Sequence, residues 1–215
     1  WRYAKVAVFL AARTLFADLA TFSTPATKKC DLLILGAGPA GITLAIEANR
    51  AAPGMDIVLA EAGGLERPDA AELDLYNGAS TGSSDYPVSA TRLRYFGGTS
   101  GHWGGWSKPL DEIDFAHRPQ AGSAGWPLDA GEMQPHYNAA ADWLELGSAD
   151  FRIASLQQSL QSHLLDFSAS EQFQNRLFRL SPPTRFGERY RQTIADNNKI
   201  ECLLNAAAVD YSTRG

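Results

Sequence analysis

A glycine-rich turn at residues 36–41 constrains the fold of this chain more than any other feature. The turn follows an apolar run at residues 32–35, which predicts a buried strand. Gly36, Gly38 and Gly41 have the spacing G-x-G-x-x-G, and the segment after them carries apolar residues at helical intervals. This order of strand, turn and helix is the context in which the spacing binds the diphosphate of a dinucleotide. The sequence therefore predicts the start of a dinucleotide-binding β-α-β unit, with the phosphates at the helix N-terminus.

A second predicted strand, residues 56–60, completes this unit and ends at Glu61. Glu61 lies about twenty residues beyond Gly41, where a carboxylate accepts hydrogen bonds from the ribose hydroxyls of a dinucleotide. A glycine turn alone is equally typical of an ordinary loop, but the two strands, the helix and the acid together favour dinucleotide binding. The pattern does not distinguish FAD from NAD.

The bulk composition excludes several classes of protein. The chain has 215 residues, of which 45% are hydrophobic, and this is enough for one sizeable core. Its formal net charge is −5 and it has no block of basic residues, which argues against a nucleic-acid partner. Cys30 and Cys202 match neither a disulfide framework nor a metal-ligand spacing, so we expect two buried thiols and no metal site.

A second glycine-rich stretch occupies residues 92–109. Five glycines lie between residues 97 and 105, among hydroxyl, histidine and tryptophan side chains. Glycine lets the backbone approach a ligand closely, and the amides and hydroxyls can donate hydrogen bonds to it. A flexible surface loop is the alternative, but Trp103 and Trp106 are unfavourable to expose to water. The stretch therefore predicts a loop that lies against a ligand.

Residues 1–29 are the least informative part of the chain. The apolar segment 6–22 predicts a surface or docking helix, because Arg13 and Asp18 interrupt it and disfavour a membrane span. The basic residues before the segment resemble the start of an export signal, which is the second interpretation. We therefore expect no firm membrane signal, favour a cytoplasmic location and keep export to the periplasm as the alternative.

Local signals predict the remaining elements. Asp129 and Glu132 have the spacing of a capping box, which predicts a helix that ends near Leu146. A long polar loop is expected at residues 64–91. The other predicted elements are an amphipathic helix at 151–167, a strand at 176–180, a helix at 185–197 and strands at 200–204 and 207–211.

Taken together, the two glycine stretches give the chain a resemblance to the glucose–methanol–choline (GMC) flavoprotein oxidoreductases. The resemblance extends from about Cys30 to the last residue and leaves residues 1–29 uncovered. Four segments carry it in the family's order: residues 36–41 with 61–64, residues 96–105, residues 125–128 with the helix after them, and residues 184–187 with the strand that leads to Asn205 and Ala206.

This resemblance implies an α/β fold of the Rossmann-like FAD-binding type, as in GMC and related FAD/NAD(P)-binding proteins. Residues 1–29 would form an N-terminal extension and residues 30–215 the FAD-binding domain, with the start of an inserted cap or substrate region at about residues 110–180. Such a fold has more strands than we find here, so we expect an incomplete domain and an N-terminal portion of a longer protein.

The resemblance also implies FAD as the tightly bound cofactor. Some family members attach the flavin covalently through a histidine in a Gly-Gly-x-Ser-x-His pattern. His102 has this position here, and a non-covalent neighbour of the flavin is the favoured interpretation. The implied cofactor-binding residues are Gly36, Gly38, Pro39, Ala40, Gly41, Glu61, Ala62, Arg92, Gly97, Gly98, Thr99, Ser100, His102, Trp103, Gly104 and Val209.

The family's reaction is oxidation of the CH–OH group of an alcohol, sugar or polyol by hydride transfer to the flavin. The implied partners are such a small-molecule substrate and an electron acceptor, either a protein or a quinone. The family's catalytic base is a histidine near the C-terminus, outside these residues. His117, His136 and His163 do not match its motif, so we assign no catalytic residue and expect the chain as given to lack activity.

Two other functions remain as alternatives. One is a different FAD-binding flavoprotein, either monooxygenase-like, which would not explain the second glycine stretch, or a disulfide reductase, for which the chain lacks a C-x-x-C pair. The other is a catalytically inert FAD-binding module that acts through protein contacts. Reduction of the flavin by an alcohol in the full-length protein would separate the enzyme from the inert module.

Overall fold

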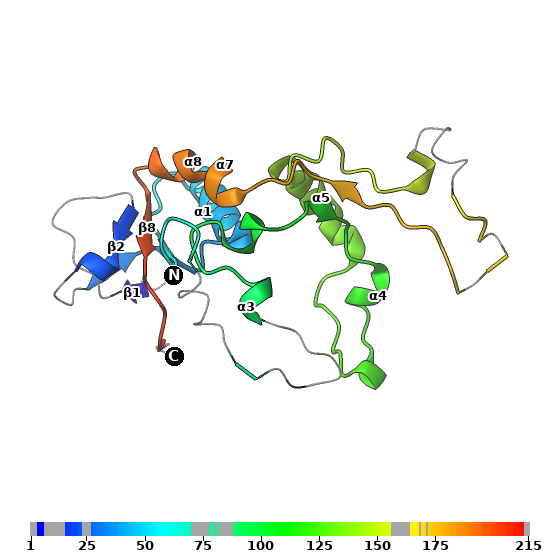
Figure 1. Cartoon of the computed structure of the whole chain (residues 1–215), viewed down its shortest axis with the longest axis horizontal. Helices are drawn as coiled ribbons and strands as arrows, with labels where there is room; N and C mark the ends of the chain where they lie inside the picture. The colour runs from blue at the N-terminus through cyan, green and yellow to red at the C-terminus, as the bar shows by residue number, and fades with distance from the viewer. Residues whose placement is uncertain are drawn as a thin grey trace. The chain divides into compact units, whose positions relative to one another are not determined.

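The computed structural model describes residues 4–6, 16–22, 27–69, 78–79, 81, 88–155, 164–167, 169–170 and 172–212, with the backbone alone at residues 4–6. The chain divides into two compact units, shown in Figure 1. The first unit comprises residues 1–102 and 185–215, and the second comprises residues 103–184. The second unit is therefore inserted into the sequence of the first.

A four-stranded parallel sheet forms the centre of the first unit. Its strand order is β2 (Phe16–Asp18), β8 (Ile200–Leu204), β5 (Ile57–Ala60) and β4 (Leu32–Leu35). Helix α1 (Pro39–Ala51) connects β4 to β5, which confirms the predicted β-α-β unit. The unit is thus mixed α/β and compatible with a Rossmann-like fold.

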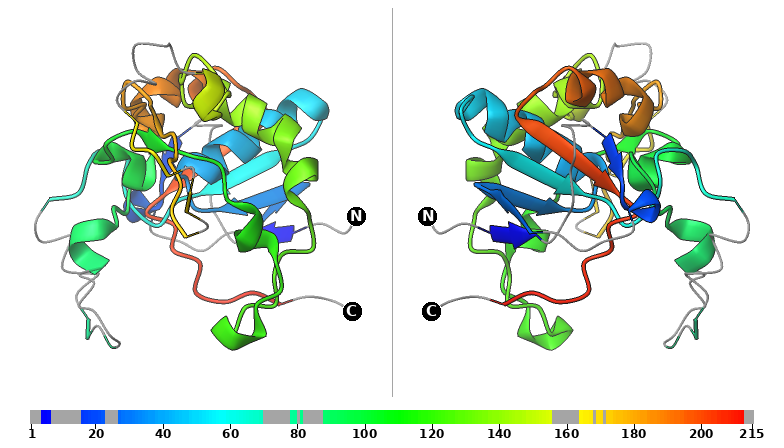
Figure 2. Two further views of the ribbon diagram at one scale, coloured as in Figure 1. Left: turned by 90° about the vertical axis from the view of Figure 1, so that its right-hand side faces the viewer. Right: turned by 90° about the vertical axis from the view of Figure 1, so that its left-hand side faces the viewer.

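Helices cover one face of this sheet. Helix α1 packs against β4 and β5, and α8 (Arg191–Ala195) packs against β8, on the same side of the sheet in Figure 2. Ile42 of α1, Leu59 of β5 and Ile194 of α8 are fully buried in this layer. Each such side chain contributes roughly 1.5–3 kcal/mol through its burial. This layer is therefore the main core, and it holds α1 in place beside the glycine turn.

Residues near the N-terminus cover the opposite face. Ala17, Cys30, Val58 and Leu203 form a buried cluster there, and Cys30 belongs to the two-stranded antiparallel ribbon of β1 (Ala4–Val6) and β3 (Lys28–Cys30). Lys28 of this ribbon forms an ion pair with the buried Glu201 of β8. The two cysteines are buried free thiols, as predicted.

The prediction of a helix at residues 6–22 is wrong for the part that the structure describes. Phe16–Asp18 is strand β2, which pairs with β8, and Leu19–Thr21 is the short 3-10 helix η1. Asp18 does not interrupt this segment, because its carboxylate accepts hydrogen bonds from the amide of Ala20 and the side chain of Asn205. Residues 7–15 lie outside the described ranges.

The C-terminal part follows the predictions up to residue 204. The strand at 200–204 is confirmed, and the predicted helix at 185–197 forms as α7 (Phe186–Arg189) and α8, with Tyr190 between them. The predicted strand at 207–211 is wrong. The chain turns at Asn205, which has a φ of 51°, and Val209 beyond it is 94% exposed.

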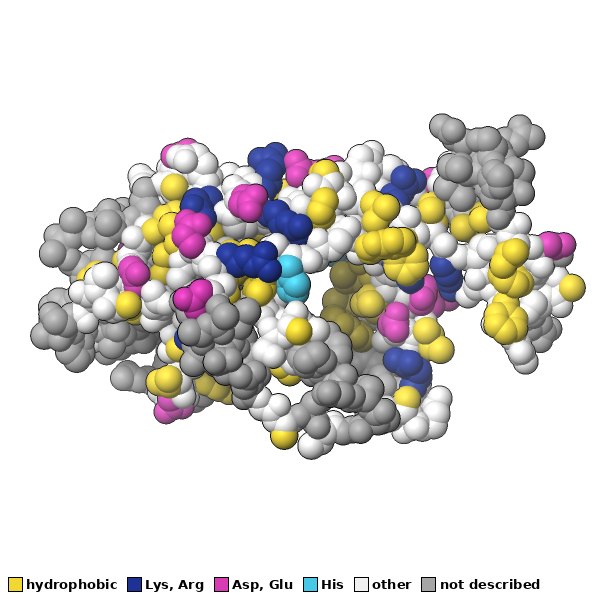
Figure 3. Space-filling view, viewed as in Figure 1, with side chains coloured by type: hydrophobic (Ala, Val, Ile, Leu, Met, Phe, Trp, Pro, Cys, Tyr) yellow, Lys and Arg dark blue, Asp and Glu magenta, His cyan; other side chains and the backbone are white. Residues whose placement is uncertain are grey.

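The second unit, where the structure describes it, has little core of its own. Its described elements are β6 (Trp106–Ser107), α4 (Glu112–Phe115), η4 (Pro119–Ala121), α5 (Ala130–Trp143), η5 (Ile153–Ser155) and β7 (Arg179–Leu180). Among its described residues, Phe115 and Ala141 are the buried hydrophobic ones. On the face drawn in Figure 3, several hydrophobic side chains of this unit reach the surface.

The predictions for this unit are partly confirmed. The capping box is present, since Glu132 donates its amide to Asp129 and accepts the amide of Asp129 at 2.8 and 2.9 Å, but α5 ends at Trp143, before the predicted Leu146. The predicted helix at 151–167 is reduced to η5 in its described part, and residues 156–163 lie outside it. The predicted strand at 176–180 shortens to β7. In the predicted loop at 64–91, residues 88–91 form the short helix α3 (Val88–Thr91), and most other positions are not described.

Candidate functional site

A pocket of about 410 Å³ lies in the first unit, at the carboxyl ends of β4, β5 and β8. This volume is within the range of small-molecule sites, roughly 300–1,000 Å³. Ligands of parallel α/β sheets bind at this edge. The lining residues are Leu35, Gly36, Gly38, Pro39, Ala60, Glu61, Ala62, Leu93, Arg94, Gly98, Thr99, Ala206 and Ala208.

The glycine turn shapes one wall of the pocket. A Cβ on Gly36 or Gly38 would meet no atom within 4 Å, so the missing side chains leave open space at the wall. A Cβ on Gly41 would instead collide with the carbonyl oxygen of Gly36, so this glycine allows the helix to approach the turn. The turn and the helix can therefore lie close together while the pocket stays open.

The N-terminus of α1 meets the same wall. Its N-cap residue is Gly38, which has no side chain to cap the helix, and Pro39 at the first helical position has no N–H. The amides at the start of a helix carry a partial positive charge and lack partners within the helix. This end of α1 is therefore suited to an anionic ligand such as a phosphate.

Glu61 lies at the end of β5, with 6% of its surface exposed. Its carboxylate accepts the amide of Ala37 at 2.8 Å and the amide of Gly63 at 2.9 Å, one on each oxygen. A carboxylate oxygen has a second acceptor site. Glu61 thus ties the glycine turn to the end of β5 and still has acceptor capacity for the hydroxyls of a ribose.

The second glycine stretch lies against the first. Gly97, which has a φ of 100°, donates its amide to the carbonyl of Ala37 at 2.8 Å. A Cβ on Gly98 would lie 3.0 Å from the Cα of Gly38. The hydrogen bond and the close approach of Gly98 to Gly38 bring the two glycine stretches together backbone to backbone at the edge of the pocket.

Ser100 is buried and holds the second glycine stretch in place through hydrogen bonds. It is buried in the 3-10 helix η3 (Gly98–Gly101), donates its hydroxyl to the carbonyl of Gly97 at 2.7 Å and accepts the amide of Phe186 at 3.0 Å. Arg185 donates to the carbonyl of Ser100 at 2.8 Å. Ser100 therefore positions the second glycine stretch, whereas the resemblance assigned it to the cofactor.

The predicted site residues fall into three groups. Those that line the pocket are Gly36, Gly38, Pro39, Glu61, Ala62, Gly98 and Thr99. Those in the same turns, outside the lining, are Ala40, Gly41, Gly97 and Ser100. The others are Arg92, His102 and Val209, which are exposed parts of the first unit, and Trp103 and Gly104, which belong to the second unit.

The resemblance implies Val209, His102 and Trp103, but none of them lines the pocket. Val209 does not line the pocket, whereas Ala206 and Ala208 from the same segment do. His102 is exposed, and its ring Nδ1 lies 3.0 Å from the carbonyl oxygen of Thr99. Trp103 donates its ring N–H to the carbonyl of Thr184 at 2.9 Å, within the second unit.

Sequence reasoning missed Arg94, the one cation among the described residues that line the pocket. Its Nε and Nη2 both donate to the carbonyl of Ala62, at 3.0 and 2.8 Å. The sequence contained a usable signal, because Arg94 lies at the start of the second glycine stretch. Leu35, Ala60, Leu93, Ala206 and Ala208 carried no such signal.

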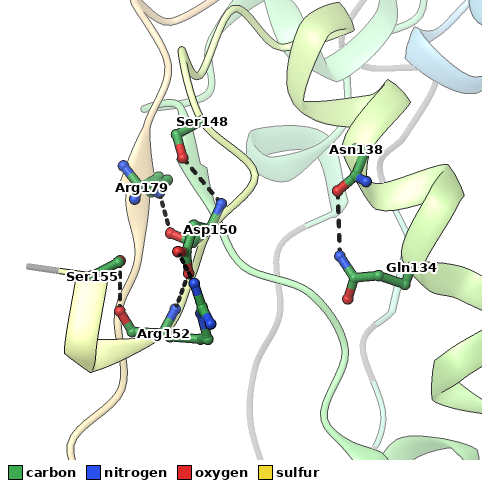
Figure 4. Close-up of polar contacts among 7 residues, drawn as sticks. All are labelled: Gln134, Asn138, Ser148, Asp150, Arg152, Ser155 and Arg179. Atoms are coloured by element: carbon green, nitrogen blue, oxygen red, sulfur yellow. Dashed lines mark hydrogen bonds and ion pairs between the residues drawn. The ribbon is translucent and has the colours of Figure 1, made fainter.

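A larger pocket, of about 1,130 Å³, lies within the second unit. Its charged side chains other than Glu112 pair with one another. Arg152 donates to Asp150 through Nε and Nη2, as Figure 4 shows, and this bond holds the pKa of Asp150 below its usual range. Asp111 pairs with Lys108 at 2.7 Å, and this bond lowers the pKa of Asp111. We take the smaller pocket as the candidate site, because it holds the predicted residues and a free helix terminus.

Several structural observations bear on other kinds of site. Among the residues that the structure describes, no three His, Cys, Asp or Glu side chains gather as a metal site. None of the helices in the described ranges has the length and apolar composition needed to cross a bilayer. His117 and His136 are exposed in the second unit, and His163 lies outside the described residues.

The residues present fit the ADP half of a dinucleotide. The open wall at Gly36 and Gly38 and the uncapped terminus of α1 suit a diphosphate, and Glu61 suits a ribose.

Comparison with protein-family profiles finds no family that matches the chain, and comparison with curated protein sequences finds no matching relative. The fold class of the first unit, mixed α/β with a parallel sheet, therefore rests on the structure itself.

Proposed function

We propose that this chain is the FAD-binding portion of a flavin-dependent oxidoreductase of the GMC type, which oxidises a CH–OH group of an alcohol, sugar or polyol. The observation that carries the proposal is the meeting of two separately predicted features. Gly36 and Gly98 belong to the two glycine stretches, and both line the same pocket, together with Glu61. A glycine turn in an ordinary loop would need neither the second stretch nor the acid beside it.

In this proposal the chain's residues bind and orient the cofactor. The amides at the N-terminus of α1 would hold the diphosphate, Glu61 would accept ribose hydroxyls, and the second glycine stretch would lie along the dinucleotide. When bound, FAD would supply the two-electron redox chemistry. The proposed partners are a small alcohol or sugar and an electron acceptor, either a protein or a quinone.

The visible absorption spectrum of the purified chain, taken before and after acid precipitation, tests the proposal. Flavin that leaves with the supernatant supports non-covalent FAD binding. Colour that stays in the pellet, with a flavin-modified peptide around His102, supports covalent attachment. A folded chain that takes up no flavin when incubated with FAD contradicts the proposal.

A matched pair of variants sharpens this test. Gly38→Val adds a side chain at the pocket wall, where a Cβ meets nothing within 4 Å, so the chain should fold but lose FAD. Gly54→Val adds the same side chain in open space at the turn after α1, outside the pocket, and should keep FAD. Equal flavin content in both variants would place the flavin elsewhere. Bleaching of the flavin by an alcohol, in the full-length protein, then distinguishes the enzyme from an inert module.

A further inference from the structure

We infer that Arg94 supplies the positive charge that faces the phosphates of the bound dinucleotide, an inference that rests on the proposed function. Arg94 is partly buried and lines the pocket. Among the described residues that line the pocket, Arg94 is the only cation and Glu61 the only anion. The carboxylate of Glu61 is already hydrogen-bonded to the amides of Ala37 and Gly63. The pocket therefore presents a positive charge that its own acid does not bind.

The guanidinium of Arg94 is held in place but not neutralised. Nε and Nη2 donate to the carbonyl of Ala62, which is a neutral group. A guanidinium has five N–H donors, so donors remain beyond these two bonds. Within the described parts of the chain, no carboxylate forms an ion pair with Arg94. A partly buried cation without a counter-ion is stabilised by an anionic ligand.

The backbone fixes where this charge lies. A Cβ on Gly63 would collide with the carbonyl of Arg94, so the segment after β5 and the start of the second glycine stretch touch directly. Gly64 forms a β-bridge with Tyr95 and accepts the amide of Phe96 at 2.9 Å. Arg94 is thus pre-organised beside Ala62, and it lines the same pocket as Gly98 and Thr99.

Arg92, the arginine that the sequence pointed to, does not have this position. Its side chain is exposed, does not line the pocket and donates to the carbonyl of its neighbour Thr91 at 3.0 Å. Arg94 instead lines the pocket with its positive charge, and the N-terminus of α1 adds a partial positive charge to the same pocket. Phosphates are the part of a dinucleotide that carries negative charge, so they are the group that Arg94 would meet.

A purely structural role for Arg94, as a clamp on the Ala62 carbonyl, makes a different prediction. A clamp would stabilise the pocket for every ligand, whereas a phosphate partner helps only ligands that have phosphates. Adenosine and ADP differ only in the phosphates, so the ratio of their affinities isolates the effect. We would measure both affinities, and that of FAD, by titration calorimetry with the full chain.

The variants are Arg94→Gln, which removes the charge, and Arg94→Lys, which keeps it. Arg50→Gln is the control, since Arg50 is exposed on α1, pairs with Glu47 at 2.7 Å and lies outside the pocket. We expect Arg94→Gln to lower the ADP affinity about tenfold, the typical effect of one charge-assisted hydrogen bond. Adenosine affinity should not change, and Arg94→Lys and Arg50→Gln should keep most of the preference for ADP.

The outcomes separate this inference from the proposed function. If the wild-type chain binds FAD and Arg94→Gln leaves the ratio of ADP to adenosine affinity unchanged, the inference is wrong and the proposed function stands. If the wild-type chain, shown to be folded, binds neither FAD nor ADP, the proposed function fails and the inference fails with it. If Arg94→Gln does not fold, the salt dependence of ADP binding by Arg94→Lys decides. If ADP binding by Arg94→Lys depends on salt as steeply as binding by the wild-type chain, the result supports a charge interaction between residue 94 and the phosphates. If the binding does not depend on salt, the inference is wrong.

Discussion

Gly97 and Gly187 pack against each other with no room for a side chain on either residue. A Cβ on Gly97 would lie 2.5 Å from the amide nitrogen of Gly187 and 2.6 Å from its Cα, and a Cβ on Gly187 would collide with the carbonyl of Phe96. The two glycines lie in the segments that precede and follow the second unit. Their contact helps join η3 to α7 within the first unit.

The variant Gly97→Ala should destabilise the first unit by about 2–3 kcal/mol, because the methyl group overlaps Gly187 and the φ of 100° disfavours any side chain. Urea denaturation followed by circular dichroism measures this. Gly54→Ala is the control, since its Cβ meets nothing within 4 Å and its φ is not left-handed. Equal unfolding midpoints for the two variants would show that the glycine contact does not stabilise the unit.

Glu61→Gln should lower both the stability of the chain and its affinity for FAD. The carboxylate accepts an amide on each oxygen, from Ala37 and Gly63, and the NH2 group of glutamine would face one of these donors. A buried donor without a partner costs about 1–3 kcal/mol. The change is measured by denaturation and by flavin retention after gel filtration. Glu47→Gln, at an exposed position on α1, is the control and should change neither quantity.

The two thiols should be protected from reagents in the native chain and react on unfolding. Burial raises the pKa of Cys202, with a smaller effect from Glu61, and burial also raises the pKa of Cys30, with a smaller effect from Asp31. The thiolate is the reactive form, so both cysteines should react slowly at pH 8 until denaturant is added. Rapid reaction of both thiols in native buffer would contradict the buried sheet.

The same pKa shifts predict how stability depends on pH. The folded-state pKa values lie above the unfolded value of about 8.5, so the folded chain holds its thiol protons more tightly. Their contribution to the free energy of unfolding is fully present below about pH 8.5 and is lost as the pH rises towards the folded-state values. Replacing both cysteines by alanine should remove this part of the pH dependence, which denaturation at a series of pH values would measure.

The first unit should fold without the second. Arg185 and Phe186, which follow the second unit, both hydrogen-bond to Ser100, which precedes it, so a short glycine–serine linker can replace residues 103–184. We expect this shortened chain to unfold cooperatively and to keep its affinity for ADP. The described part of the second unit buries few apolar side chains, so we expect that this unit alone does not fold. A shortened chain without a cooperative transition would show that the second unit is needed for stability.

The sequence by itself determined the elements whose signals are local. The turn at Gly36–Gly41 is set by the residues' own steric limits, and the start of α5 by hydrogen bonds between Asp129 and Glu132, so both could be predicted. Strand β5 could be predicted as well, because a short apolar run that ends at an acidic residue is typical of a buried strand in a dinucleotide-binding unit. These predictions needed no knowledge of residues far away in the chain.

The tertiary structure decided the rest. Phe16–Asp18 became a strand because β8 offers it hydrogen-bond partners, and residues 207–211 did not, because the chain turns away at Asn205. Arg94 rather than Arg92 reaches the pocket because Ala62, distant in sequence, accepts its hydrogen bonds. Such outcomes depend on pairings between segments that are far apart along the chain, and no local pattern of residues encodes which partner will be there.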